Sequence, residues 1–473
     1  MGGTVTGKTL LDLGYQPGAW FPAAIEAANT VLATGGSEAD MRAAIDSKKP
    51  EPHLPLRVPG TLSYTLNIRA ESPEEAANIA SVEAHMRELM RVPTVRAAAV
   101  MPDACSAGRE AGTIPVGGVV ATENAIHPGM HSADICCSMA VTVFADANPT
   151  AILDAGMTLS HFGGGGRPRG EQIKPHTDIL AAFEANSLLK PWMSAAIEHH
   201  ATQGDGNHFF YVGRMASSGQ IALVTHHGSR KPGAMLYKAG MAIAEKTRRA
   251  LSPETPEHNA WIVADSTEGE TYWSALQTIR AWTKSNHYAL HDRVAEALGL
   301  SPVDRFWNEH NFVFRRADGL FYHGKGATPA WADYAADASG LTLIPLNLAE
   351  PVLIARGRDA ANGLGFSPHG AGRNFSRSAY IRQVVGMTAE ELIARDAPGI
   401  DVRYFSGRPD LSELPSAYKN AATVRQQIAE YGLADIVDTI KPIGSIMAGD
   451  WQQDAPWRQK KAAKAEANRG TQQ

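Results

Sequence analysis

Cysteine is scarce in this chain of 473 residues, since only Cys105, Cys136 and Cys137 occur. Three cysteines cannot build a disulfide framework, so we expect a reducing, cytoplasmic setting. No apolar run approaches the ~20 residues that a membrane-spanning helix needs, and we expect no membrane partner. The start, MGGTVTGKTL, lacks a basic segment followed by an apolar one, so it does not predict a secretory signal.

An excess of positive charge is also lacking. The formal net charge is −5 and the isoelectric point is about 6.4. This balance argues against a protein that coats nucleic acid regardless of sequence, but it leaves room for an enzyme that holds nucleic acid in one local groove. With 44% hydrophobic and 20% charged residues, the chain can bury a large core.

Internal repeats, long linkers and a strict β-α-β alternation are absent from the chain, which favours one large mixed α/β domain over a doubly wound sheet. The segment 72–92 predicts a helix that Ser72 caps, with Glu75 completing a capping box. A second capped helix is predicted from Thr388. The segment 97–103, AAAVMPD, predicts a buried strand that ends at Pro102, and segments 207–213 and 221–230 predict a hairpin.

Candidate chemistry begins in HSADICCSM, where Asp134 and Cys137 stand three residues apart. A carboxylate and a thiolate can bind one divalent ion together, and a thiolate can bridge two ions. The same pattern also fits a structural role, in which Cys136 and Cys137 are small buried residues and Asp134 caps a turn.

Histidines stand beside glycine turns or strand ends in four further segments, each of which alone also fits an ordinary turn histidine. These segments are GDGNHFF with Asn207 and His208, IALVTHHGSR with His226 and Arg230, WNEHNFVF with His310, and SPHGAGR with His369 and Arg373. Imidazole, thiolate and carboxylate together suit manganese, iron or zinc better than magnesium. Arginine at such a position suits bidentate contact with phosphate.

In chain order the motifs are D-x-x-C, G-x-G-N-H, H-x-G-S-R, H-N-[FY], K-G-A and S-x-H-G-A-G-R, and in this order they resemble those of the RtcB-type tRNA-splicing RNA ligases. The segments VMPDACSAG, IPVGGVVATENAIHPG and AYKN resemble further parts of that family. The resemblance implies an N-terminal extension with a leading helix packed on the core (1–96), an RtcB-like catalytic domain (97–450) and a polar basic tail (451–473). The tail is read as a frayed helix, or else as an arm that contacts RNA.

The resemblance implies a role for each motif residue. His369 matches the nucleophile that becomes guanylylated, and Tyr418 matches an aromatic residue that packs on the guanine. The implied ligands of a two-manganese site, bridged by the cysteine, are Asp134, Cys137, His208, His226 and His310. The implied contacts to nucleotide or phosphate are Asn207, Arg230, Lys325, Gly370, Ala371, Gly372, Arg373 and Tyr418.

The implied reaction uses two Mn²⁺ ions and GTP. The neutral imidazole of His369 attacks the α-phosphorus of GTP, and the GMP then passes to an RNA 3′-phosphate made from a 2′,3′-cyclic phosphate. A 5′-hydroxyl attacks the activated end and expels GMP. The implied partners are broken RNA ends, from tRNA halves or damaged RNA, and an archease-like activator.

Departures from the family pattern lie around the nucleotide. Tyr211 takes the position of a glutamate that reads the guanine edge, and Asp450 lies at or near that of a lysine that contacts the base. The family's G-S-M-G loop becomes PLNLAEP (345–351), whose side chains crowd a loop that needs close backbone approach. Ser132 and Cys136 stand where glycines are usual. Loss of base-reading groups costs discrimination, so the nucleotide stays open.

Two alternatives keep the metal ligands without the full reaction. One is a metal-dependent phosphodiesterase that opens cyclic phosphate ends without nucleotidyl transfer. The other is a catalytically altered paralogue that binds RNA ends. A covalent adduct between His369 and a nucleotide separates both from a ligase.

Overall fold

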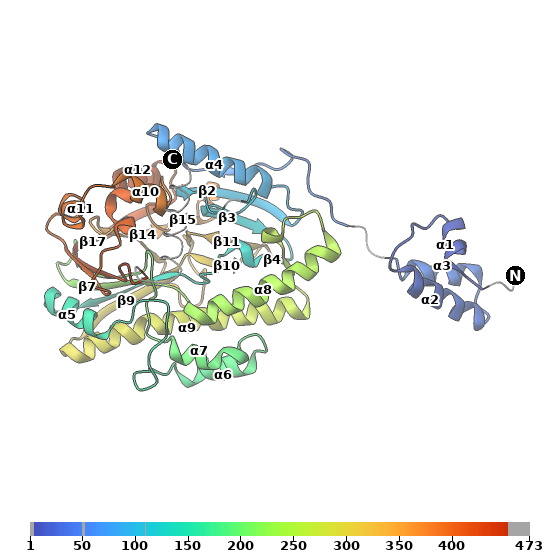
Figure 1. Cartoon of the computed structure of the whole chain (residues 1–473), viewed down its shortest axis with the longest axis horizontal. Coiled ribbons are helices and arrows are strands. Elements are labelled where there is room, and N and C mark those ends of the chain that lie inside the picture. Colours follow the sequence, from blue (N-terminus) through green and yellow to red (C-terminus); the bar gives the residue numbers. More distant parts are fainter. Residues whose placement is uncertain (1–3, 50–52, 109, 453–473) are drawn as a thin grey trace, which may run out of the picture. The chain divides into compact units, whose positions relative to one another are not determined.

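The computed structural model describes residues 4–49, 53–108 and 110–452, and Figure 1 shows it as a ribbon. The chain divides into two compact units. The smaller unit runs to Pro55 and includes Ala250–Pro253, while the larger one comprises Leu56–Arg249 and the residues from Glu254 onward.

The described residues of the smaller unit form three helices: α1 (Gly7–Asp12), α2 (Phe21–Ala33) and α3 (Glu38–Asp46). Thr6 and Ser37 cap α1 and α3 through reciprocal capping boxes, which satisfy the first backbone N–H groups. The helices share a small apolar core that includes Leu10, Ala28 and Ile45.

The larger unit is built around an eight-stranded, mostly antiparallel sheet. Its strands run in the order β13-β14-β17-β6-β7-β5-β9, with β16 parallel to β17. The backbone N–H of Leu343 on β13 donates to Asn308 Oδ1 on β9 at 2.8 Å, so the two ends of the sheet approach each other. The strands are β5 (Ser138–Phe144), β6 (Phe209–Met215), β7 (Ile221–His227), β9 (Pro302–Glu309), β13 (Leu341–Ile344), β14 (Val352–Gly357), β16 (Asp401–Tyr404) and β17 (Ala434–Met447).

A second sheet of five strands carries other parts of the sequence motifs. Its order is β1-β2-β3-β11-β10, and two short strand pairs, β4 with β8 and β12 with β15, lie outside both sheets. The bounds are β1 (Thr65–Leu66), β2 (Val95–Cys105), β3 (Val116–Thr122), β4 (Ala125–Ile126), β8 (Ile262–Val263), β10 (Asn311–Arg315), β11 (Phe321–Lys325), β12 (Ala327–Pro329) and β15 (Phe366–Pro368).

Helices cover both sheets, and the two longest, α8 and α9, run side by side (Figure 1). Gly240 on α8 allows this approach, because a Cβ there would lie 2.5 Å from the Tyr272 ring of α9. The helices of this unit are α4 (Pro73–Leu89), α5 (Pro149–Leu159), α6 (Thr177–Ala185), α7 (Met193–Glu198), α8 (Arg230–Leu251), α9 (Thr267–Leu298), α10 (Arg377–Gln383), α11 (Ala389–Asp396) and α12 (Ala421–Glu430).

The mixed α/β class is confirmed. The sheets are mostly antiparallel and are surrounded by helices, so the fold is not a doubly wound parallel sheet. The predicted hairpin is also confirmed, because β6 and β7 pair antiparallel. The capped helix at 388 is α11, with a capping box between Thr388 and Glu391.

Two local predictions were wrong. Glu75 does not complete a capping box, because its carboxylate accepts from the Glu71 N–H at 2.8 Å, while Ser72 alone caps α4. β2 does not end at Pro102 but runs on to Cys105. The register with β3 shifts between Val100 and Cys105, so the N–H that proline lacks is not needed for pairing there.

The predicted boundaries at 96/97 and 450/451 stay a prediction. The helix α4, the first helix described in the larger unit, packs on β2. Residues 453–473 of the predicted tail lie outside the described residues.

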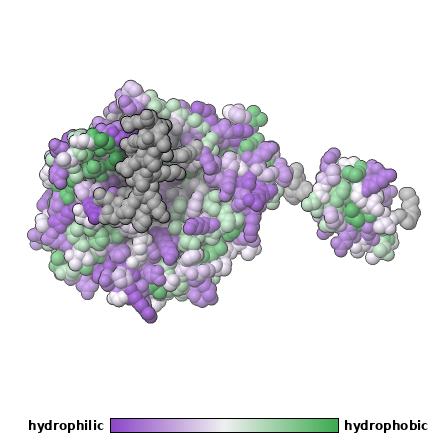
Figure 2. Space-filling view, in the orientation of Figure 1, coloured by the Kyte–Doolittle hydropathy of each residue, from purple (hydrophilic) through white to green (hydrophobic). Residues whose placement is uncertain are grey.

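Among the described helices, none combines the length and apolar character needed to cross a membrane. Figure 2 shows hydrophilic and hydrophobic residues intermixed over the coloured part of the larger unit's face.

Candidate metal and nucleotide site

The large sheet gathers the predicted metal ligands at one edge. In the register of the strands, Ser138 on β5 lies opposite both His227 on β7 and Glu309 on β9. Cys137 precedes Ser138, and His310 follows Glu309. The three strands therefore bring Cys137, His226 and His310 together although they are up to 173 residues apart in the chain.

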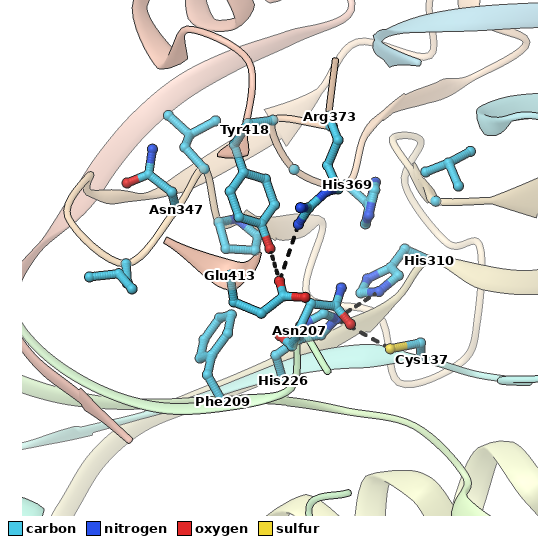
Figure 3. Close-up of a pocket in the computed structure, with 18 of the residues that line it drawn as sticks. Cys137, Asn207, Phe209, His226, His310, Asn347, His369, Arg373, Glu413 and Tyr418 are labelled. Carbon is cyan, nitrogen blue, oxygen red and sulfur yellow. Dashed lines mark hydrogen bonds and ion pairs between the residues drawn. The ribbon is translucent and has the colours of Figure 1, made fainter. Parts of the chain in front are cut away.

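Two groups of ligand atoms share the cysteine. In one, Cys137 Sγ lies 3.2 Å from His226 Nε2, which lies 3.1 Å from His310 Nε2. In the other, His208 Nε2 lies 3.5 Å from the same sulfur and 3.1 Å from Asp134 Oδ2. Each group fits one metal ion. All five predicted ligands thus meet, and Cys137 is the one common to both groups (Cys137, His226 and His310 are labelled in Figure 3).

The hydrogen bonds at Nδ1 of His208 and His226 orient these rings so that Nε2 can bind a cation. His208 Nδ1 lies 2.7 Å from the carbonyl oxygen of Gln203, and His226 Nδ1 lies 3.0 Å from that of Asn207. A carbonyl oxygen only accepts, so each neutral ring carries its proton on Nδ1 and turns the Nε2 lone pair inward. His208 then sets a lone pair against the Asp134 carboxylate. A cation between such electron-rich atoms turns repulsion into attraction.

Burial controls the protonation of these ligands. It lowers the pKa of His226 to about 3 and that of His310 well below its usual value, so both imidazoles are neutral, as metal ligands must be. Burial and the neighbouring Asp134 raise the pKa of the Cys137 thiol, a preference that a bound cation reverses.

The loop that carries Asp134 and Cys137 is held in a conformation that favours glycine. Ser132 has φ of 73° and Cys136 has φ of 58°, both in the left-handed region. These are the two positions at which the family pattern has glycines. The loop keeps its backbone shape with side chains that strain it.

His369 is fixed by a carboxylate that the sequence did not identify as part of the site. Its Nδ1 lies 2.6 Å from Asp103 Oδ2, which also accepts from the backbone N–H groups of His369 and Gly370, each at 3.2 Å. An ionised carboxylate only accepts, so the proton lies on Nδ1 and the Nε2 lone pair is free. The His369 ring centroid is 4.9 Å from that of His310, which places the predicted nucleophile beside a predicted metal ligand.

Two glycines allow the backbone to come close to Asp103 and His369. Gly372 has φ of 72°, and a Cβ on it would lie 1.8 Å from the carbonyl oxygen of Asp103. A Cβ on Gly326 of the K-G-A motif would lie 2.9 Å from the His369 ring. Any larger residue at either position displaces the histidine or its carboxylate.

These groups open into one pocket of about 410 Å³, a size typical of small-molecule sites. Of the predicted residues, it is lined by Asp134, Cys137, Asn207, His226, His310, Lys325, His369, Gly370, Ala371, Gly372, Arg373 and Tyr418. His208 is not among the lining residues, but it contacts Asp134 and Cys137, which are.

Arg230, by contrast, does not line this pocket. Its guanidinium donates to the carbonyl of Gly163 at 2.5 Å and to Thr202 Oγ1 at 3.1 Å. A Cβ on Gly204 would lie 2.2 Å from its Nη1 atom, so the guanidinium is closely enclosed. Its predicted contact with phosphate stays a prediction.

A buried carboxylate organises the far side of the pocket. Glu413 accepts from Arg377 at 2.5 Å, from Arg373 at 3.5 Å and from the Tyr418 hydroxyl (Figure 3). The guanidinium of Arg373 also stacks over the Tyr418 ring, 4.9 Å from its centroid. Glu413 thereby holds both predicted nucleotide contacts in one orientation.

Two residues of the candidate site, Glu413 and Asp103, escaped the sequence analysis. Glu413 lies in a 3-10 turn (Leu411–Glu413) without a motif around it, and its burial shows only in three dimensions. Asp103 belongs to the segment VMPDACSAG. Its carboxylate directly follows the apolar part of the predicted strand, and this was the feature that could have marked it as a site residue. The predicted departure at Tyr211 lies in the pocket wall, with its hydroxyl donating to the Ile440 carbonyl at 2.8 Å.

The site and fold define a mixed α/β protein in which two groups of candidate metal ligands lie beside a histidine whose Nδ1 contacts a buried carboxylate. The sequence profile described as "tRNA-splicing ligase RtcB" matches residues 164–448. Since this covers more than half of the chain, the protein belongs to the RtcB family.

Curated proteins named tRNA-splicing ligase RtcB are similar to it. The one from Thermococcus kodakarensis is 30% identical over 281 residues, which cover 51% of this chain and 58% of that protein. The one from Pyrococcus abyssi is 30% identical over 281 residues, or 30% of its own length. The one from Aeropyrum pernix is 27% identical over 333 residues, covering 62% of this chain and 68% of its own.

Proposed function

We propose that this protein is an RNA ligase that joins RNA 3′-phosphate or 2′,3′-cyclic phosphate ends to 5′-hydroxyl ends. The reaction runs through a covalent bond between His369 and GMP, with GTP and two Mn²⁺ ions as cofactors. The observation that carries the proposal is the arrangement of His369. Its Nδ1 is held at 2.6 Å by Asp103, which leaves Nε2 free beside the His310 ligand.

In the first step, the His369 Nε2 lone pair attacks the α-phosphorus of GTP. A nitrogen–phosphorus bond forms, the bond to the β-phosphate oxygen breaks, and pyrophosphate leaves. The attacked ring gains positive charge, and the Asp103 carboxylate on Nδ1 stabilises it. Asp103 thus fixes the tautomer before attack and offsets charge after it.

The phosphate groups of the nucleotide need donors, and the pocket supplies them. Lys325 and Arg373 provide positive charge, and the Asn207 side chain and the backbone of Ala371 and Gly372 provide N–H groups in the pocket lining. The five metal ligands are Asp134, Cys137, His208, His226 and His310. When bound there, divalent ions supply Lewis-acid neutralisation of phosphate charge.

In the following steps the nucleotide activates RNA. A 3′-phosphate oxygen attacks the phosphorus on His369, the nitrogen–phosphorus bond breaks, and His369 regains its free lone pair. A 5′-hydroxyl of the second RNA then attacks the activated 3′-phosphate, and GMP leaves. The proposed substrates are tRNA halves or damaged RNA in the cytoplasm, with an archease-like protein as activator.

One observation favours a second candidate. The loop from Pro345 to Leu348 brings Leu346 and Leu348 into the pocket wall, where they narrow the space for a nucleotide. A metal-dependent phosphodiesterase that only opens cyclic phosphate ends needs the ligands but not this space. An RNA-end-binding paralogue without turnover needs neither nucleotidyl transfer nor opening of the cyclic phosphate.

A joining assay separates these functions. Labelled RNA with a 2′,3′-cyclic phosphate end is incubated with a 5′-hydroxyl RNA, with and without GTP and Mn²⁺. A joined product that requires both supports the ligase. Opening of the cyclic end with Mn²⁺ alone, unchanged in His369→Ala, identifies the phosphodiesterase. Metal-replete protein that does neither rules out both enzymes.

A further inference from the structure

The helix α9 presents an unusual row of buried polar side chains to the large sheet. Asn286, His287 and His291 are buried where α9 packs against β5 and β7, and Arg280, 13% exposed, contacts β9. The same helix buries apolar residues such as Ile279 and Leu290. Helix faces toward a core are normally apolar, because a buried polar group costs free energy unless it is hydrogen-bonded. The polar side chains of this row therefore need hydrogen-bond or ion-pair partners, and the strands of the large sheet provide them.

Both side-chain hydrogen bonds of His287 fall on a residue next to a metal ligand. His287 Nε2 lies 3.0 Å from Ser138 Oγ, and Ser138 follows Cys137. His287 Nδ1 lies 2.7 Å from Thr225 Oγ1, and Thr225 precedes His226.

The third strand is held in the same way. Arg280 forms a buried ion pair with Glu309, which precedes His310. Arg280 also donates from Nη1 to Asp337 at 2.8 Å, so its own charge is offset on two sides.

The alternation of strand side chains explains this placement. Neighbouring residues on a strand point to opposite faces of the sheet. The ligands Cys137, His226 and His310 face the pocket, so the adjacent Ser138, Thr225 and Glu309 face α9. In the register, Ser138 lies opposite both Glu309 and His227, which follows His226.

His227 completes the contact on β7. Its ring stacks on that of His287 with centroids 3.5 Å apart, and Asn286 Nδ2 lies 3.1 Å from its Nδ1. Asn286 in turn exchanges two hydrogen bonds with the backbone of Thr202, each at 3.1 Å. β7 is thereby fixed on both sides of the His226 ligand.

The hydrogen bonds between α9 and the sheet form one chain in which each bond has a defined donor and acceptor. Ser138 Oγ donates to the His227 carbonyl at 3.3 Å, so it accepts from His287 Nε2–H. His287 Nδ1 accepts from the Thr225 hydroxyl, whose oxygen accepts from His291 Nε2–H. His291 Nδ1 accepts from the Thr142 hydroxyl at 2.8 Å. Such a directional chain specifies one arrangement of the strands.

We propose that α9 is a positioning element for the metal site, in which His287 and Arg280 hold the strand ends that present Cys137, His226 and His310. This inference rests on the metal site of the proposed function. The hydrogen bonds and the ion pair described above join the helix to neighbours of the ligands. The helix sets the spacing of the ligands through the residues beside them, and such outer partners typically change metal affinity about 10- to 100-fold.

Three buried hydroxyls on the sheet allow a matched test. Ser138, Thr225 and Thr142 are all fully buried and all bonded to an imidazole of α9. Ser138 and Thr225 adjoin ligands, whereas Thr142 lies five residues from Cys137. Each hydroxyl is removed in turn in the full chain, as Ser138→Ala, Thr225→Val and Thr142→Val, so that the control loses the same kind of bond.

Co²⁺ titration, followed by the thiolate-to-metal absorption band, gives the metal affinity, and thermal unfolding of the metal-free protein gives stability. We expect Ser138→Ala and Thr225→Val to weaken Co²⁺ binding about 10- to 100-fold and to shift the band. Thr142→Val loses similar stability but binds Co²⁺ as the parent does. Equal affinity and an unchanged band in all three variants overturn the proposal. If the parent itself binds no Co²⁺, the proposed metal site fails, which is a distinct result.

Discussion

Asp103 Oδ2 lies 2.6 Å from His369 Nδ1, and this contact leaves Nε2 as the nitrogen of His369 with the free lone pair. The carboxylate is fully buried and also accepts from two backbone N–H groups of the same loop. The orientation of the ring is therefore set by the chain around it.

Asp103→Asn is expected to slow nucleotide transfer to His369 by about 10²- to 10⁴-fold. The amide keeps the shape of the carboxylate but neither enforces the Nδ1–H tautomer nor offsets the charge that develops on the ring. Single-turnover formation of the labelled adduct measures the rate. A rate within about threefold of the parent contradicts the role given to Asp103.

Cys137 is expected to be the thiolate that binds metal, and Cys136 offers a control one residue away. Both are buried, but only Cys137 lies among the candidate ligand atoms. Cys137→Ser is expected to abolish the thiolate-to-Co²⁺ absorption band, since its sulfur is common to both ligand groups. Cys136→Ala retains the band. Loss of the band in both variants, or in neither, excludes this assignment.

Ser132 tests the strain in the ligand loop. Its φ of 73° costs a residue with a Cβ roughly 1–2 kcal/mol, while glycine loses more chain entropy on folding. We expect Ser132→Gly to raise the free energy of unfolding by about 0.5–1 kcal/mol. Ser132→Ala keeps the Cβ and is the control. Urea unfolding distinguishes them, and a glycine variant no more stable than the alanine variant contradicts the strain.

Lys325 predicts a pH dependence of phosphate binding. Burial lowers its pKa to about 8, so the ammonium is charged below that pH and neutral above it. Affinity for pyrophosphate is therefore expected to fall as pH rises through 8, by at most about tenfold per pH unit. Lys325→Arg keeps its charge and flattens the profile between pH 7 and 9.5, as isothermal titration would show. A parallel decline in both proteins assigns the effect to another group.

The same shift has a defined sign for stability. Between pH 8 and about 10.5, the unfolded chain holds a proton on Lys325 that the folded chain has released, so this residue makes stability increase with pH in that window. Below pH 8 both states are protonated and its contribution does not change.

Local elements were predictable where the determinants are adjacent in the chain. The caps at Ser72 and Thr388 and the β6–β7 hairpin follow from spacing alone. The Glu75 prediction failed because a competing N–H, that of Glu71, lies within reach of the same carboxylate. Such competition between nearby donors depends on the path of the chain before the helix.

The candidate site was predictable only as a set of motifs. Cys137, His226 and His310 met as the ordered motifs indicated, but nothing local in the sequence marks Glu413 or His287. Glu413 is recognised by its burial between Arg373, Arg377 and Tyr418, and His287 by contacts with strands 62 and 149 residues away. Long-range pairing of this kind follows from strand register, which the sequence does not display.

The central claim is that His369 becomes covalently guanylylated. Metal-replete protein is incubated with α-labelled GTP, and in parallel with ATP, and the adduct is located by peptide mass spectrometry. We predict an acid-labile GMP on His369 with GTP and Mn²⁺, lost in His369→Ala and retained in the variant of an exposed histidine, His176→Ala. Metal-bound protein that takes no label from either nucleotide contradicts the ligase mechanism.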